Sequence, residues 1–380
     1  MSESVKISVV VPTYNREDYL AAAVRSVVEQ SRAPHEVVVV DDGSNFDVAA
    51  YLERHGLTQC EVLTLDNGGK PRAVNTALAR LTGTHVWVFD DDDLADDKFL
   101  EVAANALEQT GADYAYGWHH AGRSDRADEI PITESRRPAF EGSGLTEFQT
   151  LLWGCSIAHN ATIVSLEACR TLGGLDESFP CSEDYEFQLR LAAKFRGVFV
   201  DAPAFTRRMH AGVRGSNAFA YAERDRRRRF LEHDRRFICE WLERVPLCEL
   251  PAPPSLHTPD EGQPPTLGDS LLFAFAVAAR VGAWHVALGF LSSWCREQDE
   301  AASERVSQRR FVAGIFRWSD REVLEGLTDA LKTAKSDEVR GSLSLIMPSI
   351  RRGLAQRALR VLKSGQFQDA LHTFFMALRA

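Results

Sequence analysis

Short β-branched runs alternate with helical patterns over roughly the first ninety residues, and this alternation limits the possible fold more than any other feature. Apolar runs that end in polar or turn residues predict buried strands at 5–11, 35–40, 60–65 and 85–89. A helix that Asn15 can cap is expected to bury Leu20, Val24, Val27 and Val28, and another is expected over 71–81. Strands separated by helices form βαβ units, so the sequence predicts an α/β, Rossmann-like domain with a mainly parallel sheet.

Polar clusters follow each predicted strand at the point where it ends. They are 12–15, 41–44, 67–70 and 90–93. Ligands of open α/β sheets bind beyond the carboxyl ends of the strands, and these ends lie at one rim of a parallel sheet. We therefore expect the four clusters to converge on one ligand-binding rim.

Four consecutive aspartates, Asp90 to Asp93, follow a buried strand, although like charges repel. One interpretation is an exposed acidic turn. The other is a cation site, because Mg²⁺ and Mn²⁺ prefer oxygen ligands and often take only one or two carboxylates. Asp90 and Asp92 would point to the same side of an extended chain, as alternate residues do. The position at the rim of an α/β sheet favours the cation site.

A second acidic pair, Glu183 and Asp184, opens a predicted helix. Ser182 is expected to cap this helix, and its apolar face would be Phe187, Leu191 and Phe195. Acidic residues in a first turn are favoured by the helix dipole alone, so the pair has a structural interpretation as well as a functional one.

The composition bounds the rest of the chain. A length of 380 residues predicts more than one domain, and we expect a catalytic domain at 1–240, a proline-rich linker at 241–267 and an all-α domain at 268–380. The net charge of −10 argues against nucleic-acid binding. Seven unpatterned cysteines predict reduced, mostly buried thiols and a cytoplasmic location.

Two features of the C-terminal part leave alternatives open. The apolar stretch 271–291 is long enough to span a bilayer, but Arg280, His285 and a Gly-Ala-Trp break favour two buried helices and no membrane span. The pattern Gly-x-aromatic-x-x-Ala-Leu occurs at 282–288 and again at 365–371. It is typical of tetratricopeptide-like helix hairpins, although two imperfect copies also fit a plain helical domain.

Five segments in order resemble a known family: VVVPTYNREDYLAAAVRSVVEQS, EVVVVDDGS, NGGKPRAVNTAL, VFDDDDLADDKFL and GGLDESFPCSEDYEFQLRLA. The succession is similar to the inverting nucleotide-sugar glycosyltransferases of family 2, which have the GT-A fold. It covers roughly residues 5–215, a little over half of the chain. Each motif alone is loose, but all five together are specific.

The resemblance implies a nucleotide site on the first half of the rim. Pro12, Thr13, Tyr14 and Asn15 would surround the nucleobase, usually uracil, and Asp42 would accept a hydrogen bond from it. Asp41 and Asp42 have a second interpretation, in which they only stabilise the following turn. Lys70 would contact the nucleotide or its diphosphate, and Asn75 would fix a loop.

The resemblance also implies the reacting groups. Asp90, Asp91 and Asp92 correspond to the Asp-x-Asp motif, with Asp92 as the metal ligand and Asp90 nearer the sugar or ribose, and Asp184 is the implied general base. His210 would ligate the metal or a phosphate, or would be structural. Arg207, Arg208 and Arg214 could add phosphate contacts. Side chains that could line an acceptor pocket or pack in the core are Trp118, His119, His120, Trp153 and His159.

The sequence therefore predicts a glycosyltransferase that uses Mn²⁺ or Mg²⁺ and moves one sugar to a glycan, natural-product or peptide acceptor, with a UDP-sugar as the expected donor. A nucleotidylyltransferase is an alternative, but PTYNRED is not the glycine-rich loop that such enzymes carry. An inactive scaffold with helical repeats is the other alternative.

We expect a homodimer formed through residues 268–380, and the apolar stretch 271–291 is the reason for this expectation. Light scattering coupled to size exclusion at working concentration should give twice the chain mass of 42.3 kDa. A monomeric mass would contradict the expectation.

Overall fold

A computed structural model describes residues 4–138, 145–209, 223–251, 265–297 and 347–363, together with isolated positions between 312 and 373. The chain divides into two compact units, Met1–Arg226 and Arg227–Ala380. This division lies inside helix α8 (Glu223–Arg244), before residue 240, at which the sequence predicted the domain boundary. Most of the predicted linker, 252–264, lies outside the described residues.

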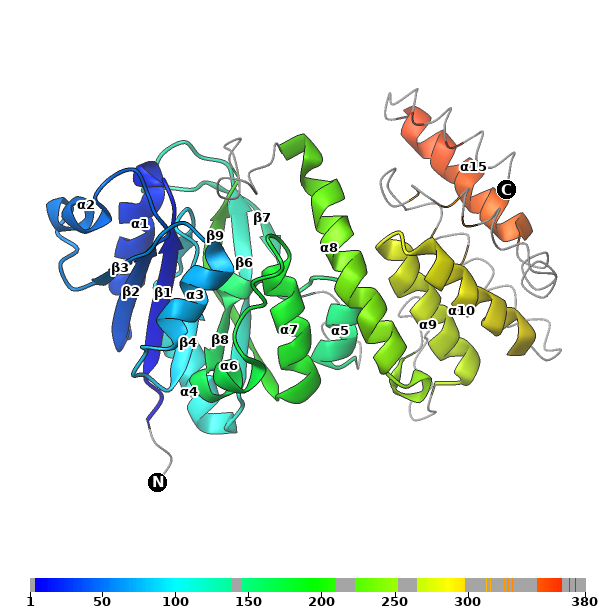
Figure 1. Cartoon of the computed structure of the whole chain (residues 1–380), viewed down its shortest axis with the longest axis horizontal. Helices are drawn as coiled ribbons and strands as arrows, with labels where there is room; N and C mark the ends of the chain where they lie inside the picture. The colour runs from blue at the N-terminus through cyan, green and yellow to red at the C-terminus, as the bar shows by residue number, and fades with distance from the viewer. Residues whose placement is uncertain are drawn as a thin grey trace. The chain divides into compact units, whose positions relative to one another are not determined.

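The N-terminal unit is built on one mixed sheet with the strand order β3-β2-β1-β4-β8-β6-β9-β5, and β7 pairs with β6 (Figure 1). The strands are β1 (Ile7–Thr13), β2 (Glu36–Asp41), β3 (Glu61–Thr64), β4 (His85–Val88), β5 (Leu94–Ala95), β6 (Tyr114–Gly122), β7 (Ile132–Arg136), β8 (Thr162–Ser165) and β9 (Gly197–Arg208). The first four in the chain are parallel, which confirms the predicted βαβ half. Beyond them β8 is antiparallel to both β4 and β6, so the sheet is less parallel than predicted.

Helices cover both faces of this sheet, because the β-branched strands are apolar on both faces. Every second residue of β1, including Val9 and Val11, packs in a core with helices α1 (Glu17–Val28), α2 (Val48–Arg54) and α4 (Phe99–Thr110). Residues of the opposite face, such as Val86 and Val88, line a small cavity with side chains of helices α3 (Lys70–Leu78), α6 (Leu166–Leu172) and α7 (Glu183–Lys194). The result is a three-layer α/β domain whose strand ends are free to carry loops.

Two short helices complete this unit. They are α5 (Glu147–Trp153) and the 3₁₀-helix η1 (His159–Ala161), which leads directly into β8. Because β8 runs opposite to β4, the residues before β8 lie beside the residues that follow β4.

The described part of the C-terminal unit is helical, as predicted. It contains the remainder of α8, the 3₁₀-helix η3 (Leu247–Glu249), α9 (Leu267–Arg280), α10 (Trp284–Glu297) and α15 (Met347–Lys363). The apolar stretch 271–291 forms two helices that turn at Gly282, whose φ is 70°, which confirms the helix-pair interpretation. No helix in the described ranges is long and apolar enough to cross a membrane. The second copy of the repeat pattern falls largely outside the described residues.

Cysteine burial differs from the prediction. All six cysteines described are free, but only Cys169 and Cys181 are buried, whereas Cys155 and Cys248 are exposed. Burial raises the pKa of the Cys169 thiol to about 12, which makes that thiol unreactive.

A buried ion pair stabilises the C-terminal unit. The Arg357 side chain is 2% exposed and donates to both carboxylate oxygens of Asp369, at 3.0 and 2.8 Å. We expect Asp369→Leu, which leaves the arginine buried without a partner, to lower the free energy of unfolding of this unit by roughly 3–5 kcal/mol. The double variant Arg357→Met/Asp369→Leu should recover most of the loss, measured by urea denaturation of the full chain.

A matched control is Arg244→Met in the same unit, because Arg244 pairs with Glu240 at 3.7 Å while its side chain is 71% exposed. That change should cost less than about 1 kcal/mol. An Asp369→Leu effect as small as the control would show that the pair does not hold the unit together.

Candidate active site

The loops after the parallel strands meet at one rim, as predicted. The backbone N–H of Asp42 donates to the carbonyl of Thr13 at 2.9 Å, which joins the loops after β2 and β1. The Nζ atom of Lys70 donates to Oδ1 of Asp90 at 2.5 Å, which joins the start of α3 to the turn after β4. The predicted polar clusters are therefore linked by direct hydrogen bonds.

The loop after β1 is fastened to the loop after β2. Asn15 has a φ of 50°, and its side-chain oxygen accepts a 2.8 Å hydrogen bond from the N–H of Asn45. The predicted helix cap is therefore wrong: α1 has Arg16 at its N-cap, without a side-chain hydrogen bond, because the Asn15 amide is used across the loops. The other residues expected around the nucleobase lie at or just past the end of β1, Pro12 and Thr13 buried and Tyr14 half-buried.

The adjacent aspartates after β2 have different partners. Asp41 accepts from the N–H of Ser44 at 2.8 Å, so it stabilises the turn. Asp42 accepts from the N–H groups of Gly68 and Gly69 at 2.8 and 2.9 Å, and from the side chain of Asn67. Burial raises the pKa of Asp42, and these hydrogen bonds act in the opposite direction. A carboxylate offers about four acceptor positions, so Asp42 shapes the loop before α3 and retains capacity for one more donor.

Each of the four aspartates after β4 has a partner from another element. Asp90 pairs with Lys70. Arg16 lies 3.6 Å from Asp91 and 3.8 Å from Asp92. Asp93 accepts from the Asn160 side chain at 2.9 Å and from the backbone N–H of Arg208 at 2.8 Å. The repulsion between the aspartates is thus offset by cations and N–H groups of the protein, so the run is not a simple exposed turn.

The pKa values follow from burial and from these charges. Burial raises the pKa of Asp91 to about 7, with Asp92 and Asp90 adding repulsion and Arg16 opposing it. Burial alone would lower the pKa of Lys70, but Asp90, Glu183 and Asp184 raise it above its ordinary value. Lys70 therefore remains a cation between the aspartate turn and the start of α7.

Three of these side chains form a group that could hold a metal ion. Candidate ligand oxygens of Asp90, Asp92 and Asp93 lie within 4.8 Å of one another. Both oxygens of Asp93 accept hydrogen bonds, from Asn160 and Arg208, whereas Asp90 pairs with Lys70 and Asp92 lies 3.8 Å from Arg16. An all-oxygen donor set at a sheet rim fits Mg²⁺ or Mn²⁺. The predicted second ligand, His210, lies outside the described residues, as does Arg214.

The predicted base, Asp184, lies in the first turn of α7, next to Glu183. Its Oδ1 accepts from the N–H of Tyr185 at 2.8 Å. Burial raises the pKa of Glu183 to about 7, with a contribution from the charge of Asp184, while Lys70 acts to lower it. The predicted cap is wrong here too, because Ser182 has a φ of 61° and its hydroxyl makes no capping hydrogen bond.

Arg208 does not fit its predicted role as a phosphate contact. It is buried, and its guanidinium donates to the carbonyls of Asp92, Ser124, Arg126 and Ala127. Its charge lies 4.5 Å from the ring centre of Tyr19. Arg208 is therefore committed to holding the aspartate turn against the chain after β6.

The candidates for an acceptor pocket have different surroundings: Trp118 and His119 on β6 contact residues of β9, whereas His159 does not share these contacts. The Trp118 indole donates to Asp201 at 3.0 Å, and His119 stacks on Phe205 with ring centres 4.9 Å apart. His159 instead interacts with the charges of Lys70, Asp90 and Asp184. Trp153 is half-buried at the end of α5.

Arg16 and Asn160 are site residues that the sequence did not indicate. Arg16 follows the predicted nucleobase loop, and its charge was the available signal, since a buried acidic run requires cations nearby. Asn160 could not be found this way, because its contact with Asp93 depends on the reversed direction of β8.

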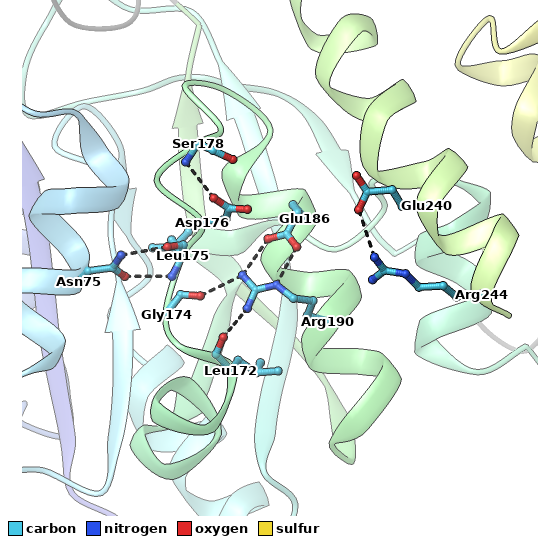
Figure 2. A network of polar contacts seen from close by, with 10 residues as sticks. All are labelled: Asn75, Leu172, Gly174, Leu175, Asp176, Ser178, Glu186, Arg190, Glu240 and Arg244. Carbon is cyan, nitrogen blue, oxygen red and sulfur yellow. Dashed lines mark hydrogen bonds and ion pairs between the residues drawn. The ribbon is translucent and has the colours of Figure 1, made fainter.

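One loop ties the helix that carries Lys70 to the helix that carries Asp184, as Figure 2 shows. Asn75 of α3 donates to the carbonyl of Leu175 and accepts from its N–H, both at 2.9 Å, so its side chain fixes this loop. Arg190 of α7 donates to the carbonyls of Leu172 and Gly174 at 2.8 and 2.9 Å. It also forms an ion pair with Glu186 at 2.7 Å.

Residues 8–163 match a family model described as Glycosyl transferase family 2. Glycosyltransferase GlyA of Streptococcus pneumoniae is 30% identical over 118 residues, which are 30% of this chain and 17% of GlyA. Poly(ribitol-phosphate) β-N-acetylglucosaminyltransferase TarS of Staphylococcus aureus is 34% identical over 116 residues, 29% of this chain and 20% of TarS. The match thus spans less than a quarter of either relative.

A crystal structure of TarS residues 1–349 in complex with UDP has a similar fold, with a TM-score of 0.51 at 16% identity, covering 93% of this chain and 91% of that one. The sheet order and the aspartate turn at its rim define a GT-A domain. This domain belongs to glycosyl transferase family 2, as the five motifs implied.

The Arg190 contacts generate a stability prediction. Arg190→Met would leave the carboxylate of Glu186, a residue only 7% exposed, without its ion pair and two carbonyls without their donor. We expect the free energy of unfolding of the N-terminal unit to fall by roughly 2–4 kcal/mol in urea. Arg126→Met is the control in the same unit, because Arg126 pairs with Glu129 while 72% exposed. Equal effects of the two changes would show that the contacts of Arg190 do not stabilise this unit.

Proposed function

We propose that this protein is a metal-dependent, inverting glycosyltransferase that moves one sugar from a nucleotide-sugar to an acceptor nucleophile. The observation that supports it most strongly is the set of charges around Lys70. This cation interacts with Asp90 of the aspartate turn and with Glu183 and Asp184 at the start of α7. The residue proposed to bind the diphosphate, a candidate metal ligand and a candidate base therefore interact within one domain, whose residues 8–163 match the family 2 model.

A UDP-sugar is the donor class that we propose. TarS 1–349, whose fold is similar, was crystallised in complex with UDP. In this chain, Asp42 retains acceptor capacity toward the N–H of a base, and the loop 12–15 lies next to it through the bond between Asp42 and Thr13.

The proposed reaction is a single displacement. Asp184 accepts the proton of the acceptor nucleophile as that atom bonds to the anomeric carbon. The bond from this carbon to the diphosphate oxygen breaks on the opposite face, which inverts the configuration and releases the nucleoside diphosphate. Lys70, which pairs with Asp90, would attract the diphosphate with its positive charge. The chemistry that a divalent cation at Asp90 and Asp92 supplies in such a site is stabilisation of negative charge on the leaving group.

The acceptor, the location and the oligomeric state belong to the same proposal. A glycan, a natural product or a peptide could supply the nucleophile, and the helical C-terminal unit would bind it or form a homodimer. Six free cysteines are compatible with a cytoplasmic location.

Calorimetric titration with UDP, with and without Mn²⁺, tests the proposal. We expect binding that depends on Mn²⁺ and falls at least about tenfold in Asp92→Asn, which removes a ligand charge. Asp97→Asn is the matched control, because Asp97 is an exposed aspartate just beyond the cluster.

Asp184→Asn should retain UDP binding but lose roughly 10²–10⁴-fold in transfer rate.

The outcomes separate the alternatives. Binding of another nucleoside diphosphate in place of UDP would leave the reaction class standing and correct the donor. Absence of all nucleotide binding would contradict the enzyme and favour a scaffold.

A further inference from the structure

His159 is a buried polar side chain whose ring nitrogens form no hydrogen bond with the described residues. The residue is 7% exposed. Neither Nδ1 nor Nε2 has a hydrogen-bond partner among the residues that the structure describes. A buried polar group without a partner destabilises a fold, and water or a ligand can supply the partner that the described residues do not.

The position of this ring is fixed by its neighbours. The next residue, Asn160, donates to Asp93, and its carbonyl accepts from the Trp87 indole at 2.7 Å. Phe187 of α7 packs edge-on against the imidazole, with ring centres 5.9 Å apart. A side chain held in this way can recognise a ligand without first being ordered.

One side of the ring faces a small cavity within the described part of the domain. His159 lines a cavity with mainly apolar residues, among them Val74, Val88 and Leu175. This cavity has room for little more than one water molecule. A larger ligand would therefore have to reach the ring from a side other than this cavity.

The charged groups near the ring are those of the reacting site. They are Lys70, Asp184 and Asp90. Two of the three, Lys70 and Asp90, are the residues proposed to act on the diphosphate and on the metal of the donor. An imidazole can donate from one ring nitrogen and accept at the other. Hydroxyl groups also combine a donor with acceptors, which makes a sugar hydroxyl a suitable partner.

We propose that His159 is a specificity-determining residue that forms a hydrogen bond with a hydroxyl group of the transferred sugar. This assignment rests on the proposed function. It adds to that function a residue that reads the sugar rather than the nucleotide, presented by η1 next to Lys70 and Asp90.

The test compares two affinities in each variant, with UDP and a set of UDP-sugars (UDP-glucose, UDP-galactose and UDP-N-acetylglucosamine) as calorimetric probes in the presence of Mn²⁺. We expect His159→Phe, which keeps an aromatic ring against Phe187, to weaken the preferred UDP-sugar by roughly 10- to 100-fold. Binding of UDP, which lacks the sugar, should change by less than about threefold. His159→Gln should restore part of the loss, because its amide can donate and accept.

Phe187→Leu is the matched control, since it alters packing against the ring but removes no hydrogen-bonding group. It should leave the ratio of the two affinities unchanged. A His159→Phe variant that weakens UDP and UDP-sugar by the same factor, or neither, would overturn the assignment. If the unaltered protein binds neither UDP nor any UDP-sugar, the proposed function itself fails, which is a different result from an unchanged ratio in a protein that binds both.

Discussion

The charge balance of Asp90 to Asp93 is the constraint on which the site depends. Four adjacent carboxylates, of which Asp91 and Asp93 are buried, are stable only if other parts of the chain bring positive charge or N–H groups to them. Lys70, Arg16, Asn160 and Arg208 do so from α3, the start of α1, η1 and the end of β9. Elements far apart in the sequence are thereby fixed around one turn.

This balance also explains why the turn suits a cation and a diphosphate. Asp90 and Asp92 form ion pairs with Lys70 and Arg16 and belong to the group that could ligate a metal, whereas Asp93 accepts hydrogen bonds at both oxygens. Lys70 stays charged because its carboxylate neighbours outweigh its burial. Negative ligands for a metal and a cation for phosphate therefore lie next to each other, which is the combination that a nucleotide-sugar requires.

Local patterns in the sequence were sufficient for the first half of the sheet and its rim. The β-branched runs predicted β1 to β4, and polar residues at strand ends predicted that Asp42, Lys70 and Asp90 would converge. The two helix caps were predicted wrongly, and the reason differs between them. Asn15 is drawn to Asn45, thirty positions along the chain, and Ser182 adopts a left-handed conformation, and no local pattern encodes either.

The reversed strand β8 accounts for what the sequence missed at the site. In a parallel sheet, a strand starts at the edge opposite to the carboxyl rim, so residues just before it lie far from the ligand. Because β8 pairs antiparallel with β4, with Trp87 opposite Ile163, β8 starts at the rim. The residues just before β8 therefore lie at the rim as well. That is why Asn160 reaches Asp93 and why His159 lies beside Lys70 and Asp90. One change of strand direction thus brings a buried imidazole to the end of a strand that was predicted to carry only carboxylates.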